Sequence, residues 1–174
     1  MLKEKIQNAI NKQINAELWS AYLYLSMSSY FESISLRGFA NWMRVQAQEE
    51  LAHAMKFYNY VTERGGRVFL SAIDKVPTDW KTPLNVFEET YKHEQKVTGL
   101  INNLVNLSVN EKDHATSNML QWFIDEQVEE ESSADEIVQK LKLIGKDGSG
   151  LFILDKEMAA RVFTPPADKN QESN

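Results

Sequence analysis

The chain has 174 residues, enough for one domain with a sizeable core, and a formal net charge of −6. It contains no cysteine, which excludes disulfides, zinc–thiolate sites, iron–sulfur clusters and thiol nucleophiles and fits a reducing cytoplasm. The acidic balance argues against a nucleic acid as the main ligand, and no stretch approaches the roughly 20 apolar residues of a membrane span.

Apolar residues that recur at steps of three and four predict an all-α protein. The helices are expected, in chain order, at about 4–34, 36–64, 83–109, 113–144 and 149–161. Residues that typically cap or stop helices mark their ends: Gly65, Gly66, Thr82, Pro83, Asp113 and Gly145. Residues 1–163 are therefore expected to form one domain, and the polar segment 164–174 a flexible tail.

Each of the first four predicted helices carries one glutamate on its apolar stripe. In chain order these residues are Glu17, Glu50, Glu94 and Glu130. An isolated ionised carboxylate in such a position is very costly unless it is paired or binds a metal. Because the same stripes hold almost no basic residues, the pattern predicts multivalent cations inside a helical bundle.

The spacing of these glutamates agrees with the predicted turns. In an antiparallel hairpin, residues equally far from the turn lie at the same height. The mean of positions 17 and 50 is 33.5, and the mean of 94 and 130 is 112; both values fall in a predicted turn. Each hairpin is therefore expected to set its two carboxylates level with each other.

The segment 66–81 is long for a connection without secondary structure in a compact domain. It is explained by a crossover that runs along the bundle and brings the two hairpins into register. Within this crossover, the segment 67–70 is expected to form a short strand or a contact patch.

Two short motifs add detail to the predicted metal site. Glu50 and His53 lie one helical turn apart, so both can bind one ion, and Gln127 and Glu130 form the corresponding pair on the fourth helix. A carboxylate-bridged two-metal bundle usually has a second Glu-x-x-His pair at that place. The fourth helix therefore departs from the common pattern.

One ion is expected to be held by Glu17, Glu50 and His53, and a second by Glu94, Glu130 and the bridging Glu50. Oxygen ligands with a single nitrogen suit iron or manganese rather than copper or structural zinc. Two such ions about 3.5–4 Å apart can act together on dioxygen. A pair with so few histidines also favours ions that pass through rather than stay.

These residues resemble those of the non-haem ferritins of bacteria and archaea, over nearly the whole chain. The resemblance implies a ferritin-like four-helix bundle with a long crossover and a short fifth helix. It also implies a shell of 24 identical subunits that oxidises Fe²⁺ with dioxygen or peroxide and stores it as a ferric mineral. Leu51 stands where haem-binding bacterioferritins carry methionine, so no haem is expected.

The resemblance assigns further residues to the iron centre. Gln127 matches a glutamine near the ion pair, and Tyr24 a tyrosine beside it. Glu49, Glu126 and Glu129, together with Glu130, resemble a third iron site. Without the resemblance, these residues would belong to a solvated acidic helix face, and Tyr24 to the core.

Other residues are open to two interpretations. His93 and His114 are expected at the surface. The segment 151–154 is apolar on nearly all sides, so the fifth helix is expected either to cover its own bundle or to meet three copies at a fourfold axis.

Two other functions are considered. Di-iron oxidases and peroxidases that act on a small substrate usually carry two Glu-x-x-His motifs, and here the fourth helix lacks the histidine. DNA-protecting mini-ferritins take their ligands from two subunits and lack a fifth helix.

Overall fold

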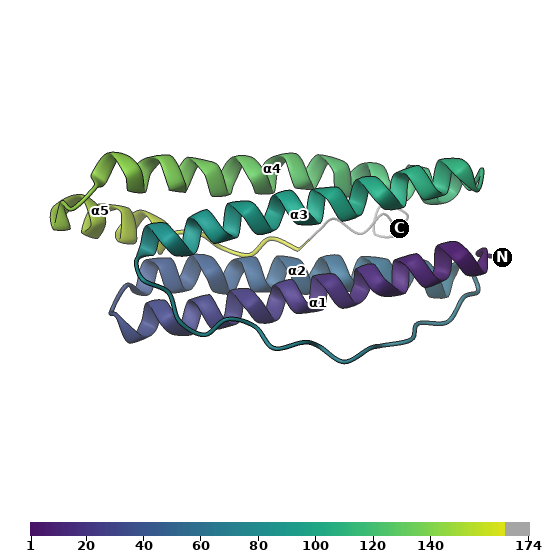
Figure 1. The fold of residues 1–174 in the computed structure, drawn as a ribbon, viewed down its shortest axis with the longest axis horizontal. Helices are drawn as coiled ribbons and strands as arrows, with labels where there is room; N and C mark the ends of the chain where they lie inside the picture. The colour runs from purple at the N-terminus through teal and green to yellow at the C-terminus, as the bar shows by residue number, and fades with distance from the viewer. Residues whose placement is uncertain (166–174) are drawn as a thin grey trace, which may run out of the picture.

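The computed structural model describes residues 1–165 as a four-helix bundle with a short fifth helix (Figure 1). The helices are α1 (Glu4–Ser33), α2 (Arg37–Glu63), α3 (Pro83–Asn110), α4 (His114–Ile144) and α5 (Gly148–Met158). Within the described residues there is no strand, and the expected fold class is confirmed. α5 ends three residues before the expected position 161. The expected flexible tail lies, from residue 166 on, outside the described residues.

The two hairpins turn in the same way. Ser35 and Lys112 adopt left-handed backbone angles, with φ of 62° and 54°. In each turn the next amide donates to the carbonyl five residues earlier, at 3.0 and 2.9 Å. Both turns lie where the glutamate spacing predicts them, so the two carboxylates of each hairpin project at the same height.

The N-termini of α3 and α4 are capped by the side chains of neighbouring residues. The hydroxyl of Thr82 accepts a hydrogen bond from the amide of Asn85, and the carboxylate of Asp113 accepts one from the amide of Thr116. Asp113 also receives two hydrogen bonds from the guanidinium of Arg64, at 3.1 and 3.2 Å. This pair joins the end of α2 to the start of α4.

The beginning of α2 is capped by a distant residue. Its own N-cap residue, Leu36, supplies no side-chain hydrogen bond. Instead Asp155 of α5 accepts from the amides of Gly38 and Phe39, at 2.8 and 3.0 Å. A Cβ added at Gly38 would lie 1.6 Å from the carbonyl oxygen of Asp155, so this close approach requires glycine. α5 is thereby fixed on its own bundle.

The crossover runs along the outside of α1 and is held there by polar side chains of that helix (Figure 1). The segment 67–70 forms no strand, so only the expectation of a contact patch holds. Its backbone groups bond to side chains of α1 rather than to another strand. The contacts proceed in order along both segments: Gln7 with Arg67, Asn11 with Arg67 and Phe69, Asn15 with Ser71 and Ala72, and Ser26 with Pro77.

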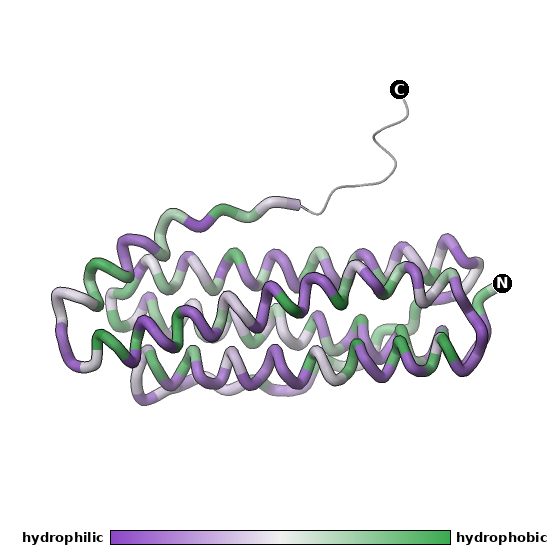
Figure 2. The backbone as a smooth tube through the Cα atoms, turned by 90° about the horizontal axis from the view of Figure 1, so that it is seen from above, coloured by the Kyte–Doolittle hydropathy of each residue, from purple (hydrophilic) through white to green (hydrophobic). Residues whose placement is uncertain are grey.

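The apolar core is divided into two clusters. One, near α5, includes the fully buried Phe31, Phe39 and Phe87. The other, toward the N-terminus, includes Ile10 and Phe57. Hydrophobic and hydrophilic residues alternate along every helix, as the amphipathic pattern requires (Figure 2). Among residues 1–165, no helix combines the length and apolarity that a membrane span needs.

Candidate metal centre

A layer of buried acidic side chains lies between the two apolar clusters. Glu17, Glu50 and Glu94 are each 1% exposed, and Glu130 is 7% exposed. His53 lies among them at 3% exposure. Each of α1 to α4 contributes one of the glutamates, at the positions that the apolar stripes predict.

Glu17, Glu50 and His53 form a compact group. Each offers a ligand atom, and these atoms all lie within 4.8 Å of one another. Gln13 donates to Oε1 of Glu17 at 2.8 Å, whereas Oε2 of Glu17 and Oε2 of Glu50 have no hydrogen-bond partner among the described residues. Nδ1 of His53 lies 3.5 Å from Oε2 of Glu50. Buried carboxylate oxygens without a donor are rare, because the lost solvation is not replaced. A bound cation would supply the missing partner, so this group fits a metal ion.

Protein donors orient the other two carboxylates. The hydroxyl of Tyr24 and the amide of Gln127 both donate to Glu94, the latter at 3.4 Å. Gln46 donates to Oε2 of Glu130 at 2.5 Å. Among the described residues, Glu94 lies outside both groups of three whose ligand atoms approach within 4.8 Å.

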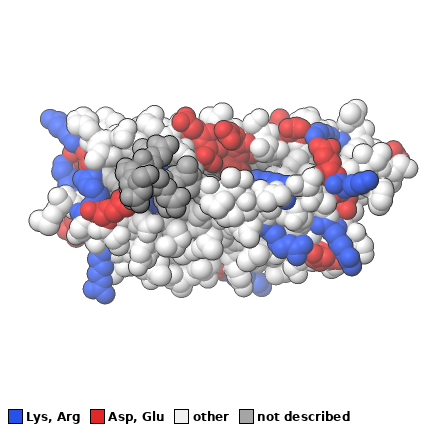
Figure 3. Space-filling model, turned by 180° about the vertical axis from the view of Figure 1, so that it is seen from behind, with Lys and Arg blue, Asp and Glu red and all other residues white. Residues whose placement is uncertain are grey.

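The residues expected at the third iron site are only partly brought together. Glu126 and Glu130 form a second group of potential ligands with His53, again within 4.8 Å. Glu49 is partly buried, and its Oε2 lies 2.6 Å from Arg161. Glu129 is exposed. Acidic side chains gather over α4 on the face that Figure 3 shows.

Burial of these acids favours their neutral forms. It raises the pKa of Glu17 and Glu50 well above the ordinary value, and neighbouring carboxylates raise both further. Burial, with the charge of Glu130 second, raises the pKa of Glu94 to about 8. Burial and Glu94 raise the pKa of the Tyr24 hydroxyl. Without a metal, the layer therefore holds protons that a cation would displace.

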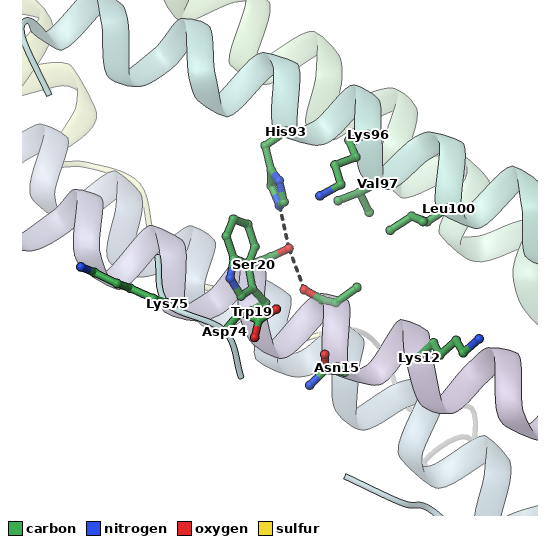
Figure 4. Close-up of a pocket in the computed structure, with 11 residues that line it drawn as sticks. Lys12, Asn15, Trp19, Ser20, Asp74, Lys75, His93, Lys96, Val97 and Leu100 are labelled. Carbon is green, nitrogen blue, oxygen red and sulfur yellow. Dashed lines mark hydrogen bonds between the residues drawn. The ribbon is translucent and has the colours of Figure 1, made fainter. Parts of the chain in front are cut away.

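His93 is only partly exposed, so the expectation that it lies at the surface rather than among the ligands holds only in part. Its ring is largely covered and packs against Trp19 and Tyr24, with ring centroids 5.3 and 6.0 Å apart, because α3 lies against α1 at this height. Nε2 of His93 lies 2.7 Å from the hydroxyl oxygen of Ser20 (Figure 4). Burial, assisted by the charge of Lys96, lowers the pKa of His93 to about 4. The imidazole is therefore neutral near pH 7, beside an open recess of about 370 Å³.

Two residues that lie at the centre are assigned no function by the sequence analysis. Gln46 lies on the buried stripe of α2, four residues before Glu50, which is a weak signal for a polar partner. Arg161 follows α5 and gives no periodic signal at all. His114 is exposed, as expected, and Trp122 packs edge-on against His53 with centroids 5.4 Å apart.

Comparison with known proteins shows the family to which the chain belongs. Residues 7–144 match the family described as Ferritin-like domain. The chain is 49% identical over 161 residues to a bacterial non-heme ferritin of Bacteroides fragilis, a match that covers 92% of this chain and all of that one. The chain belongs to the ferritin family.

Other members of the family are also similar to this ferritin. A bacterial non-heme ferritin of Staphylococcus aureus is 38% identical, and the match covers 94% of this chain and 98% of that one. A solved structure of an engineered closed form of the Archaeoglobus fulgidus ferritin superposes with a TM-score of 0.93 at 58% identity, covering 94% of this chain and all of that one. A structure of the open pore ferritin of the same archaeon gives 0.92 at 57% identity, covering 93% of this chain and all of that one. Membership of the family supports iron storage as the general function.

Proposed function

We propose that this ferritin oxidises Fe²⁺ with dioxygen at the buried carboxylate layer and stores the product as a ferric mineral. The observation that carries the proposal is the pair of buried carboxylate oxygens without donors, on Glu17 and Glu50, beside His53. In this proposal Glu17, Glu50 and His53 bind one iron ion as substrate. Glu50 bridges to a second ion that Glu94 and Glu130 bind.

The chain's own residues then have distinct tasks. The carboxylic acids lose protons as iron enters, because only their ionised forms bind it well. Tyr24 and Gln127 hold Glu94 in one orientation by donating to it, and Gln46 does the same for Glu130. The apolar clusters on both sides keep bulk water from the layer. Glu49, Glu126 and Glu129, with Glu130, form a third position that receives iron next to the pair.

The exposed apolar side chains support assembly into a homo-oligomer, which we propose is a shell of 24 subunits. Several large apolar side chains on α1, α2 and the crossover are exposed in the single chain: Tyr22, Leu25, Leu51, Met55, Phe69, Leu70 and Ile73. On α5, Leu154 and Met158 are buried against the bundle, whereas Phe152 and Ile153 are 71% and 66% exposed. α5 therefore covers its own bundle with one side and offers the other to further copies. In this proposal the protein works in the cytoplasm and binds no haem.

Aerobic loading with Fe²⁺ tests the function. A storage protein should retain hundreds of iron ions per particle as an orange species of several hundred kilodaltons, measured by size-exclusion chromatography with iron analysis. Retention of only two iron ions per chain would contradict storage and favour a di-iron oxidase or peroxidase that acts on a small substrate.

A further inference from the structure

The segment after α5 turns back and runs along the bundle (Figures 1 and 2). Asn41 of α2 fixes its backbone: the side-chain amide donates to the carbonyls of Met158, Ala159 and Arg161, at 3.4, 3.4 and 2.9 Å. The segment is thereby held at a defined height, and this height brings the side chain of Arg161 to the edge of the carboxylate layer.

The guanidinium of Arg161 is bound on several sides. Nη2 donates to Oε2 of Glu49 at 2.6 Å, and Nη1 donates to Oε1 of Gln46 at 2.9 Å. The guanidinium also lies over the ring of Trp42, 4.2 Å from its centroid. Only 24% of the side chain is exposed. An arginine that is ion-paired, stacked on an aromatic ring and mostly buried is held in one defined conformation, unlike an exposed surface ion pair.

Gln46 connects this contact to the metal centre. Arginine can only donate hydrogen bonds, so the oxygen of the Gln46 amide must face Arg161 and its nitrogen must face Glu130. The geometry agrees, because Nε2 of Gln46 donates to Glu130 at 2.5 Å. Arg161 and Glu130 thus favour the same orientation of the Gln46 amide, and Arg161 holds the amide in place from the opposite side.

Glu49 is the residue at which Arg161 and iron would compete. Two of the expected third-site residues, Glu126 and Glu130, already converge with His53, but Glu49 is engaged by Arg161. Arginine stays charged at any pH the protein experiences, so deprotonation cannot release it. A second cation that binds Glu49 can replace it.

We propose that Arg161 is a positioning residue of the iron centre: its guanidinium occupies the cation position at Glu49 and orients Gln46 on Glu130. This inference rests on the proposed function. It follows that a third ion binds at Glu49 only by displacing Arg161, and that this displacement loosens the side-chain attachment of the segment 159–165, whose backbone Asn41 still holds. The first two ions bind without this movement, so the segment reports occupancy of the third position.

A single label can test the movement, because the chain has no cysteine. Val162 is 77% exposed and adjacent to Arg161, so Val162→Cys accepts a nitroxide spin label at one defined place. The assembled full-length protein is titrated with Zn²⁺, which does not change oxidation state. The spin-label mobility should stay constant over the first two equivalents per chain and rise with the third. A label that stays equally immobile through the third equivalent overturns the proposal.

Substitution of Arg161 separates positioning from general stability. In Arg161→Gln the label should be mobile before metal is added, and the third equivalent should bind about tenfold more tightly, since a charge-assisted contact no longer competes. The first equivalent, bound by Glu17, Glu50 and His53, should bind as in the parent, and the second should bind more weakly, because Gln46 is no longer held on Glu130. Arg161→Lys keeps the charge without the planar fork and should give an intermediate third affinity.

A matched control removes one arginine charge at a different place, on the exposed face of α2. Arg44→Gln breaks the exposed pair between Arg44 and Glu32 and should leave all three affinities unchanged. Third-equivalent binding in Arg161→Gln equal to the parent overturns the role of Arg161, while two-equivalent loading still supports the iron centre. If the parent fails to load the first two equivalents, the proposed function itself falls, and the inference with it.

Discussion

The cost of burying the acidic layer can be measured at Glu94. This carboxyl is 1% exposed, and burial, with Glu130 second, raises its pKa from 4.5 to about 8. A carboxyl whose pKa is higher in the folded state than in the unfolded chain stabilises most below the unfolded value. That contribution is lost as the pH rises toward the folded value. At pH 7, about 2.5 pH units above the unfolded value, the loss is about 3 kcal/mol.

The substitution Glu94→Gln removes this pH-dependent loss at nearly constant size. In the metal-free protein, Glu94→Gln should raise the free energy of unfolding by about 3 kcal/mol at pH 7 and by less than about 1 kcal/mol at pH 5. The free energy of unfolding of the parent should therefore fall from pH 5 to pH 8, and that of the variant should fall by less. Urea titration of the chelator-treated protein at these pH values measures both quantities.

A second variant on the same helix provides the control. Glu88 is exposed and lies 3.5 Å from Lys142, so Glu88→Gln should change stability by less than about 1 kcal/mol at either pH. Metal should reverse the order, because Zn²⁺ stabilises the parent through Glu94 more than it stabilises Glu94→Gln. The reasoning is refuted if Glu94→Gln is less stable than the parent at pH 7 by the same amount as at pH 5.

Three further variants and one control test other parts of the molecule. His53→Ala should slow the fast phase of iron oxidation in stopped-flow absorbance without preventing assembly; an unchanged initial rate would exclude His53 from the site. Joint replacement of Glu49, Glu126 and Glu129 by alanine should preserve oxidation at the pair but change the oxygen consumed per iron, measured with an oxygen electrode. Gly38→Ala should cost about 2 kcal/mol or more in urea unfolding, because its Cβ would lie 1.6 Å from an α5 carbonyl and disturb two capping bonds. By contrast, Gly99→Ala on α3, with nothing within 4 Å of the added Cβ, should be neutral or stabilising.

Most of the fold could be predicted because its signals are local. The helix periodicity, the caps Thr82 and Asp113 and the midpoints of the glutamate spacing all depend on residues near one another in the chain. The glutamates were predictable for the same reason, since a charged residue on an apolar stripe is conspicuous in sequence. The heights of Glu17 and Glu50 followed from one turn, without knowledge of the other hairpin.

The rest depends on contacts between distant segments. Asp155 caps α2 across more than a hundred residues, and nothing near Leu36 indicates it. His93 is covered by Trp19 only because α3 lies against α1, whereas its own helix leaves it beside the stripe rather than on it. Arg161 reaches Glu49 through the path of a segment that has no periodicity. Such contacts carry no pattern in the chain and become visible only when the packing is known.

The arrangement of the core explains how the bundle tolerates a destabilising centre. Four buried carboxylates at one height would repel each other and lack solvation, but they are confined to a single layer. The apolar clusters on both sides bury aromatic and aliphatic side chains and join all four helices independently of that layer. Stability is therefore concentrated outside the carboxylate layer, and the polar groups of that layer can stay poorly satisfied. In the proposed function, the same separation lets the carboxylates exchange protons for iron without loss of the fold.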